Sequence, residues 1–161
     1  MFTAAVITAS DKGSCGKRED VSGKTVEALL RAAGYVVFSR TVLPDDMAQL
    51  SAKMIELTNE DVALILTTGG TGFSPRDCTP EATLAIVERQ CPGIPEAMRS
   101  LSMQITKRAM LTRAVAGIRR QSLIVNLPGS PKAVTECLEF ILPTLDHGLR
   151  ILRGETSECA R

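Results

Sequence analysis

The apolar and polar positions of the chain follow two alternating periods. Short runs rich in Val, Ile and Leu, at 4–10 and 62–66, are typical of buried strands. Apolar residues that recur every three or four positions, at 21–34 and 44–60, are typical of amphipathic helices. The same criteria predict further strands at 35–43, 114–118 and 122–127, and further helices at 79–89, 93–106 and 130–154.

Strand and helix alternate along most of the chain, without a repeat, a low-complexity tract or a linker. Such alternation is typical of parallel sheets covered by helices. We therefore predict an α/β fold, a single three-layer α/β/α domain over residues 1–161 with a largely parallel, mixed sheet. With 161 residues, 44% of them hydrophobic, the chain is long enough for one compact core and too short for two.

Individual residues indicate where the helices begin and end. Gly34 is expected at the position just beyond the first long helix, and Asp46 is expected to cap the second. Thr79 is the expected N-cap of the third, with Pro80 in its first turn. Pro143 predicts a kink or a boundary in the last helical segment.

The charge balance excludes some classes of partner. With 19 basic and 18 acidic residues, the net charge of +1 gives no overall attraction to nucleic acid or to an anionic membrane. No apolar run approaches the roughly 20 residues that span a bilayer. The cysteines at 15, 78, 91, 137 and 159 include no C-x-x-C pair, which argues against a disulfide framework or a zinc site. We expect a soluble protein of the reducing cytoplasm.

Candidate chemistry lies in the loops that follow the predicted strands. In open α/β sheets, ligands bind beyond the carboxyl ends of the strands. The loops in question here are 10–22, 43–46, 67–79 and 126–132. Two of them contain glycines, whose bare backbone N–H groups can approach an anion, and two are acidic. This combination predicts phosphates bridged to a divalent cation, because Mg²⁺ prefers oxygen ligands and retains several waters.

Three common signatures are not fulfilled. The segment "SGKT" ends like a P-loop, but Arg18 stands where the first glycine belongs. The segment "GTGFSP" begins like a dinucleotide fingerprint, but Pro75 replaces its third glycine. The only histidine, His147, falls in the last helical segment, so histidine base catalysis is not supported. The predicted chemistry is therefore positioning together with a metal ion.

Several motifs together resemble one known family. They are "SDKGSCG", "DVSGKTVEALLRAAG", "VLPDD", "TTGGTGFSPRDCTPEAT", "PGIPEAMR" and "TRAVAGIRRQSLIVNLPGSPKA". The chain resembles, nearly end to end, the molybdopterin adenylyltransferases of molybdenum-cofactor biosynthesis. This is the MogA/MoaB type, which is related to one domain of plant Cnx1 and to a domain of gephyrin. The pairing of "TTGGTG" and "RDCTPEA" with "LPGSPKA" carries the resemblance.

The resemblance implies an activity and a set of site residues. The activity is transfer of AMP from ATP to the terminal phosphate of molybdopterin, with release of pyrophosphate. Asp45 and Asp77 correspond to the catalytic, metal-associated aspartates, with Mg²⁺ as the expected ion. Similar proteins form trimers or hexamers, so a homotrimer is expected. The implied binding residues for substrate or nucleotide are Ser10, Asp11, Gly69, Gly70, Thr71, Gly72, Gly129 and Ser130.

Simpler interpretations exist for several of these residues. Asp45 could serve only at a helix start, Asp77 only as an N-terminal helix charge, and Gly129 only in an ordinary turn. Arg76 could pair either with a phosphate or with Glu81. The stretch 97–135 contains no acidic residue. Its basic residues form either a solvated face or a subunit contact, or else steer an anionic substrate through Arg113 or Lys132.

Two other functions agree with the motifs. One is a molybdopterin-binding or scaffold module without catalysis. The other is a nucleotidyltransferase that modifies another phosphorylated acceptor, because the loops specify phosphate and metal but not the pterin.

Overall fold

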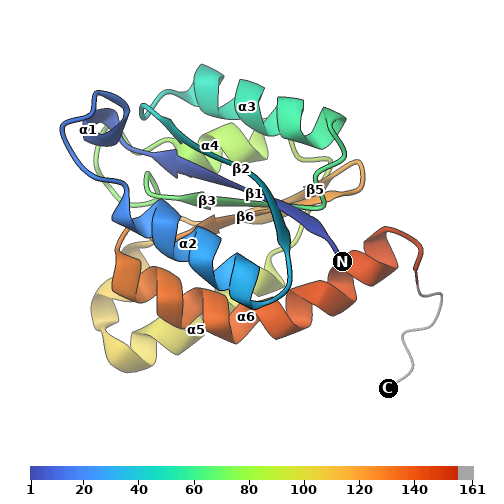
Figure 1. Cartoon of the computed structure of the whole chain (residues 1–161). Helices are drawn as coiled ribbons and strands as arrows, with labels where there is room; N and C mark the ends of the chain where they lie inside the picture. Colours follow the sequence, from blue (N-terminus) through green and yellow to red (C-terminus); the bar gives the residue numbers. More distant parts are fainter. Residues whose placement is uncertain (156–161) are drawn as a thin grey trace.

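A six-stranded sheet in the order β2-β1-β3-β6-β5-β4 forms the centre of the computed structural model, which describes residues 1–155 (Figure 1). The strands are β1 (Thr3–Ala9), β2 (Val36–Leu43), β3 (Leu64–Thr68), β4 (Arg89–Gln90), β5 (Ala116–Arg119) and β6 (Ser122–Leu127). The helices are α1 (Asp11–Ser14), α2 (Val21–Ala32), α3 (Met47–Asn59), α4 (Thr79–Leu84), α5 (Gly93–Ile105), the 3-10 helix η1 (Lys107–Leu111) and α6 (Pro131–Leu152).

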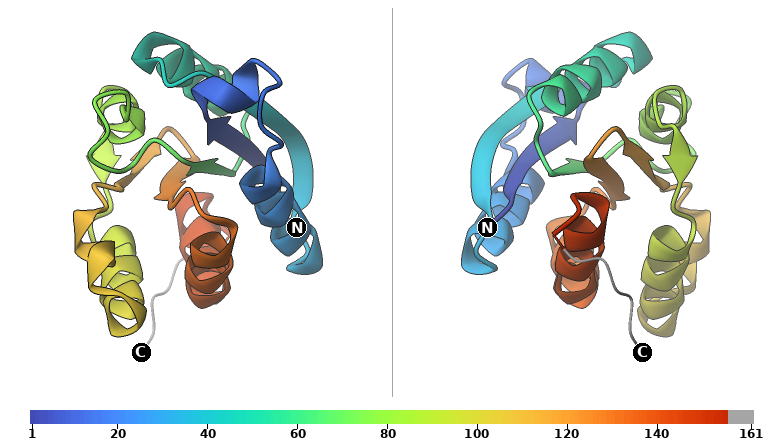
Figure 2. Two further views of the ribbon diagram at one scale, coloured as in Figure 1. Left: turned by 90° about the vertical axis from the view of Figure 1, so that its left-hand side faces the viewer. Right: turned by 90° about the vertical axis from the view of Figure 1, so that its right-hand side faces the viewer.

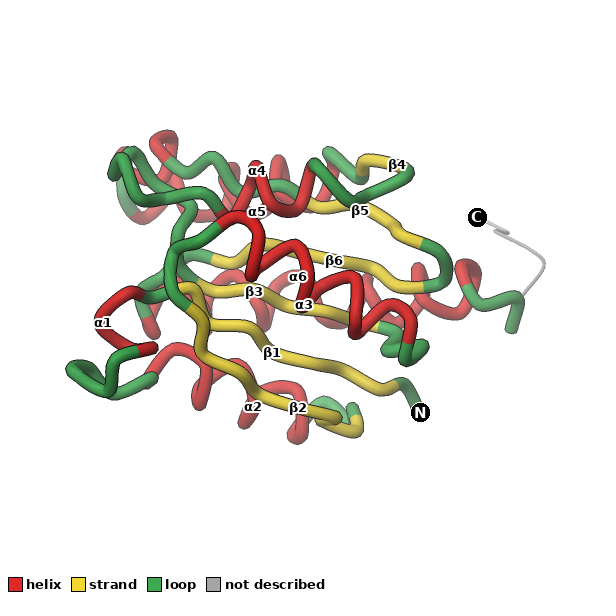
Figure 3. The backbone as a smooth tube through the Cα atoms, turned by 90° about the horizontal axis from the view of Figure 1, so that it is seen from above, coloured by secondary structure: helices red, strands yellow, loops and turns green. Residues whose placement is uncertain are grey.

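Most of the sheet is parallel. Figure 3 shows the strands side by side. Strands β2, β1, β3 and β6 run in one direction, and β5 runs antiparallel to both of its neighbours, β6 and β4. Thr8 of β1 lies beside Thr68 of β3, which lies beside Leu127 of β6. The carboxyl ends of these three strands are therefore level, and the loops that leave them start from the same edge.

Helices cover both faces of the sheet, as the end-on views in Figure 2 show. On one face α2, α5 and α6 bury an apolar cluster that includes Leu30, Met98 and Leu138. On the other face α3 and α4 bury a second cluster that includes Leu50 and Ala82. The prediction of a three-layer α/β fold with a largely parallel, mixed sheet is confirmed.

The chain order places a switch point beside β1. From β1 the chain passes through α2 on one face of the sheet, and from β3 it passes into α4 on the other face. Adjacent strands whose connections leave toward opposite faces open a crevice between their carboxyl ends, where ligands of such folds bind. The crevice here lies between the loops that follow Ala9 and Thr68.

The helix-end predictions are mostly accurate. Asp46 caps α3 by accepting a hydrogen bond from the backbone N–H of Gln49 at 2.8 Å. Gly34, which follows the C-cap of α2, has a φ of +88°. A helix boundary at Pro143 was also considered, and this part of the prediction was wrong, since Pro143 lies inside α6.

Two predictions near α4 were also wrong. The N-cap is Cys78, without a side-chain bond, because Thr79 turns its hydroxyl to the carbonyl oxygen of Gly69 at 3.0 Å. The helix ends at Leu84 rather than at 89, because the following backbone joins the sheet. There Glu88 N–H donates to Ile118 O at 2.8 Å, and a short strand, β4, follows.

The remaining general predictions concern membranes and thiols. Within residues 1–155, no helix is both long and apolar enough to cross a bilayer. Cys15, Cys78, Cys91 and Cys137 are free thiols, and burial raises the pKa of Cys78, Cys91 and Cys137. Cys159 lies outside the described residues.

Candidate functional site

A pocket of about 470 Å³ opens at the crevice and is lined by all four predicted loops. Side-chain bonds join these loops to one another. The Ser22 hydroxyl donates to Gly129 O at 2.8 Å, and the Thr68 hydroxyl donates to Pro128 O at 2.7 Å. The predicted residues that line the wall are Ser10, Asp45, Gly69, Gly70, Asp77 and Gly129.

Four predicted residues lie outside this wall. Asp11 stands behind Asp45 and bonds to its backbone and side chain. Thr71 and Gly72 line a second pocket on the other side of the glycine loop. The Ser130 hydroxyl caps α6 by accepting from Ala133 N–H at 3.2 Å. The structure thus brings the two candidate metal ligands together and separates the candidate binding residues into two groups.

The glycine loop requires glycine at two positions. Gly69 has a φ of +87°, and a Cβ atom there would lie 2.4 Å from the carbonyl oxygen of Ala9. Gly70 has a φ of +65°, and its Cβ would lie 2.9 Å from Oδ1 of Asp45. Gly129 lies directly against Gly69, since a Cβ on Gly129 would be 3.4 Å from the Gly69 Cα. Backbone without side chains therefore faces the pocket from two turns, one at Gly69 and Gly70 and the other at Gly129.

Replacement of Gly69 by alanine is expected to reduce the free energy of unfolding by about 1–3 kcal/mol, because of its positive φ and the contact with Ala9 O. Urea denaturation measures the change. Gly148→Ala is the matched control, because Gly148 lies inside α6 and no other part of residues 1–155 comes within 4 Å of where its Cβ would lie. The control should stabilise the protein by up to about 1 kcal/mol. Equal stability of Gly69→Ala and the wild type would contradict this account of the loop.

Asp45 has an environment unusual for a carboxylate. Its Oδ2 accepts from Asp11 N–H at 3.0 Å, and its own N–H donates to Asp11 Oδ1 at 3.0 Å. Its Oδ1 is buried and has no hydrogen-bond partner among the residues that the structure describes. Burial raises the pKa of Asp45, and the negative charges of Asp11 and Asp77 raise this pKa further. A buried acceptor without a donor, near a second carboxylate, is suited to a cation.

Asp77 approaches the same pocket from the loop before α4. Its Oδ2 accepts from Ser74 N–H at 3.2 Å and would lie 2.9 Å from a Cβ on Gly72, so a side chain at position 72 would displace this carboxylate. Among residues 1–155, no group of three or more His, Cys, Asp or Glu side chains could hold a metal by itself. Two carboxylates fit Mg²⁺ when phosphate oxygens and waters complete its shell.

Arg76 pairs with a residue of the chain that was not predicted. Its Nε and Nη2 donate to the two carboxylate oxygens of Asp11, each at 3.0 Å. The hydrogen bonds from Arg76 lower the pKa of Asp11. Arg76 and Glu81 therefore do not pair. Asp11 instead links Arg76 to Asp45.

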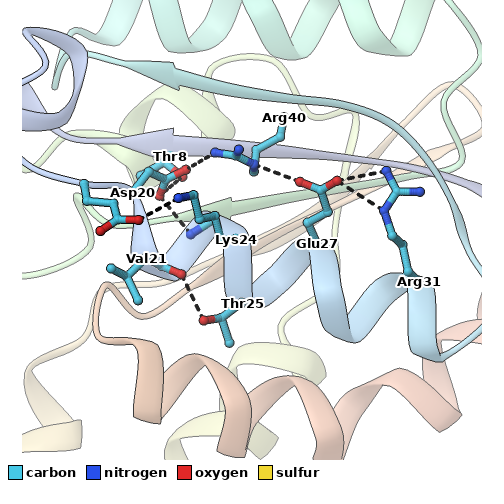
Figure 4. A network of polar contacts seen from close by, with 10 residues as sticks. Thr8, Asp20, Val21, Lys24, Thr25, Glu27, Arg31 and Arg40 are labelled. Carbon is cyan, nitrogen blue, oxygen red and sulfur yellow. Dashed lines mark hydrogen bonds and ion pairs between the residues drawn. The ribbon is translucent and has the colours of Figure 1, made fainter.

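A network of polar side chains shapes the first loop (Figure 4). Asp20, which lines the pocket, caps α2 and accepts from Gly23 N–H and from the Thr8 hydroxyl, both at 2.9 Å. Arg40 of β2 donates to Asp20 at 2.8 Å and to Glu27 at 2.8 Å. Sequence reasoning placed Asp20 in the site loop but missed Thr8 and Arg40, because their positions within strands gave no sign that they face α2.

Arg113 was one of two basic residues that could steer an anionic substrate, and in the structure its side chain contacts the glycine loop. Its guanidinium donates to Gly72 O at 2.8 Å and to Asp77 O at 2.9 Å, and it pairs with Glu81. Lys132, the other candidate, is 83% exposed and lies 4.0 Å from Glu136. Arg113 therefore belongs to the support of the glycine loop.

The second pocket, of about 300 Å³, was not predicted. Thr71 and Gly72 form its edge, and it extends between α5, η1 and α6. Most of its wall is apolar, including Met98, Ala114 and Cys137. Most of its residues come from the glycine loop, from α5 and α6, and from the segment 106–114 between them, and no single motif joins these parts of the chain.

The fold and these pockets define an open three-layer α/β protein with a pocket at the switch point, where ligands of such folds bind. The chain belongs to the MoCF_biosynth family, described as a probable molybdopterin binding domain, whose model matches residues 5–147. The family resemblance inferred from the motifs is thereby confirmed.

Curated relatives match most of the chain. A molybdopterin adenylyltransferase of Helicobacter pylori is 38% identical, over 92% of this chain and 86% of its own length. That of Escherichia coli K12 is 41% identical, over 84% of this chain and 71% of its own. Gephyrin of Dictyostelium discoideum is 39% identical, but the match covers only 23% of that longer protein.

Solved structures agree with the fold in detail. The molybdopterin biosynthesis enzyme MoaB of Thermus thermophilus superposes with a TM-score of 0.90, at 41% identity, over 96% of this chain and 98% of its own. The molybdopterin biosynthesis Mog protein of Mycobacterium ulcerans superposes with a TM-score of 0.89, at 32% identity, over 94% and 99%.

Proposed function

We propose that this protein is a molybdopterin adenylyltransferase, which transfers AMP from ATP to the terminal phosphate of molybdopterin and releases pyrophosphate. The observation that carries the proposal is the meeting of Asp45 and Asp77 in one pocket against a glycine loop. The identity of 38–41% to curated molybdopterin adenylyltransferases supports it.

Asp45 and Asp77 would hold Mg²⁺, which neutralises phosphate charge when bound and so reduces repulsion between the two substrates. Each carboxylate supplies oxygen ligands, and the unpartnered Oδ1 of Asp45 is one of them. Phosphate oxygens and water would fill the remaining positions. Asp11 keeps Asp45 oriented through the two reciprocal hydrogen bonds.

The remaining pocket residues would position the phosphates. Backbone at Gly69, Gly70 and Gly129 can approach an anion closely because these residues have no Cβ, and Ser10 lies on the same wall. In the transfer, an oxygen of the molybdopterin phosphate forms a bond to the α-phosphorus of ATP. The bond from that phosphorus to the bridging oxygen breaks, and pyrophosphate leaves with the electron pair. Alignment of the two substrates supplies much of the rate.

The second pocket gives a place for a ring. Thr71 and Gly72 separate it from the carboxylate pocket. We assign the planar ring of one substrate to the apolar pocket and the reacting phosphates to the acidic one. This division keeps Thr71 and Gly72 among the binding residues, and leaves Ser130 as the helix cap beside Gly129.

The cellular setting completes the proposal. The chain would act as one domain over residues 1–161, in the cytoplasm, as a homotrimer or hexamer. Light scattering on the purified protein tests the oligomeric state.

The direct test is incubation of the protein with [α-³²P]ATP, Mg²⁺ and molybdopterin. We expect label on molybdopterin together with an equal amount of pyrophosphate, and loss of both products with EDTA. Binding of molybdopterin without label would favour the scaffold function. Label on a different phosphorylated acceptor, with none on molybdopterin, would favour another nucleotidyltransferase.

A further inference from the structure

Arg113 ties together both ends of the exposed segment that contains Asp77. Its Nε donates to Gly72 O at 2.8 Å and its Nη2 donates to Asp77 O at 2.9 Å. Its backbone N–H donates to Thr71 O at 2.8 Å. One residue, 36 positions further along the chain than Asp77, thus bonds to the start and to the end of the segment 72–77.

The segment has little other support within the described part of the chain. Its residues from Phe73 to Arg76 are exposed, with Phe73 at 69%. Inside it, Asp77 N–H donates to Ser74 O at 2.9 Å, and Ser74 N–H donates to the Asp77 carboxylate at 3.2 Å. Arg76 adds its pairing with Asp11. The direction of the Asp77 side chain therefore depends chiefly on polar contacts, and the two carbonyl bonds from Arg113 fix both ends of the segment.

Among basic side chains, only the planar guanidinium of arginine can make this set of hydrogen bonds. A guanidinium presents several N–H groups in fixed directions, so it can bond to two carbonyl oxygens and a carboxylate at once. Lysine has the same charge on a single nitrogen and cannot span the three acceptors with the same geometry. The side chain of Arg113 is 32% exposed, so its contacts are partly shielded from water.

We propose that Arg113 is a positioning residue that fixes the Asp77 carboxylate for the metal and nucleotide, without touching either. This inference rests on the proposed function, because it deepens the role of Asp77. It also assigns a role to one basic residue of the stretch 97–135, which contains no acidic residue. Mutation of a residue that orients a metal ligand without touching the metal typically reduces metal affinity or activity by about 10-fold to 100-fold.

The test uses Arg113→Lys and Arg113→Gln in the full chain. Mn²⁺ serves as a paramagnetic probe and α,β-methylene-ATP as a nucleotide that cannot transfer AMP. We expect EPR titration to show Mn²⁺ affinity reduced by about 10-fold in both variants, with nucleotide affinity in the absence of metal changed by less than about threefold. In turnover, kcat should fall by a similar factor while the KM for ATP stays close to that of the wild type.

Two control variants separate positioning from general stability. Arg153 has the same kind of contacts at a distant place, since it donates to Gln121 O at 3.1 Å and pairs with Asp61. Arg153→Lys should destabilise the fold as much as Arg113→Lys but leave Mn²⁺ affinity unchanged. Glu81→Gln removes the ion pair of Arg113 and keeps both carbonyl bonds, so Mn²⁺ affinity should change by less than about threefold.

Equal Mn²⁺ affinity in the wild type and both Arg113 variants would overturn the inference. An equal loss in Arg113→Lys and Arg153→Lys would also overturn it, because the effect would then be one of stability. Binding of Mn²⁺ and nucleotide by a wild-type protein that transfers no AMP would contradict the proposed function instead. In that case the comparison of Mn²⁺ affinities still decides whether Arg113 positions Asp77.

Discussion

Replacement of Asp77 by alanine is expected to lower the rate of adenylyl transfer by about 10² to 10³ while the protein remains folded. Asp77 is one of the two carboxylates that we assign to the metal, and its loss leaves Asp45 as the only assigned carboxylate ligand. Electrostatic groups aimed at the reacting phosphates supply a large share of the rate in phosphoryl transfer.

Folding should change little in this variant. The Asp77 carboxylate accepts a hydrogen bond from Ser74 N–H at 3.2 Å, and that bond lies at the surface. Stopped assays with labelled ATP measure the rate, and urea denaturation measures the stability. Asp77→Asn is the companion variant, because it keeps an acceptor for Ser74 and removes only the charge. Normal turnover in either variant would remove Asp77 from the catalytic assignment.

Replacement of Asp45 by asparagine is expected to reduce adenylyl transfer by a similar factor of about 10² to 10³ and to make the protein more stable at neutral pH. Asparagine can keep the acceptor for Asp11 N–H, whereas the buried negative charge and its repulsion from Asp11 and Asp77 are lost. Substitutions that relieve such strain commonly stabilise proteins by about 0.5–2 kcal/mol.

The dependence of this stabilisation on pH has a definite sign. The pKa of Asp45 is raised in the folded protein above its ordinary value of 3.8, so between these two values the folded state holds more protons than the unfolded state. The contribution of Asp45 to stability therefore falls as pH rises through that window. The advantage of Asp45→Asn should be small below pH 3.8, grow as the pH rises and become constant above the raised pKa.

Unfolding curves in urea, measured from about pH 3 to pH 8 so that they cover both sides of the ordinary carboxyl pKa, give this difference. Asp11→Asn is the control with the opposite sign, since pairing with Arg76 lowers the pKa of Asp11 and its charge favours the folded state above that pKa. If Asp45→Asn is less stable than the wild type at pH 7, burial of its charge does not cost stability as described. If it keeps full activity, Asp45 is not a metal ligand.

The sequence was sufficient to predict the layers of the fold and the edge of the sheet at which the candidate site lies. Periodicity identified the long helices and the buried strands, because each repeats its apolar spacing over many residues. It missed β4, since Arg89 and Gln90 form a two-residue strand that is exposed and has no periodic pattern. Because the chain leads into this short strand, α4 ends earlier than the composition of the segment 79–89 suggests.

At the site, the sequence located the residues that have local signals. Gly69 and Gly70 stand out because glycine is needed where φ is positive, and Asp45 and Asp77 follow strands or precede helices. Partners that are distant in the chain were not predictable in this way. Arg76 could equally have reached Glu81, and only the folded loops show that Asp11 is in reach. Arg113 lies 41 positions beyond Gly72, and no pattern in the sequence indicates that the two residues meet.

The order of strands in the sheet has a consequence during protein synthesis. The last parallel strand to emerge from the ribosome, β6, pairs with β3 in the interior of the sheet, and the turn at Gly129 directly follows it. A nascent chain that ends before Ser122 leaves the edge of β3 open and lacks one wall of the crevice. Nucleotide capture should therefore begin only after β6 and the turn at Gly129 have been translated, and shorter translation products should present an unpaired edge to chaperones.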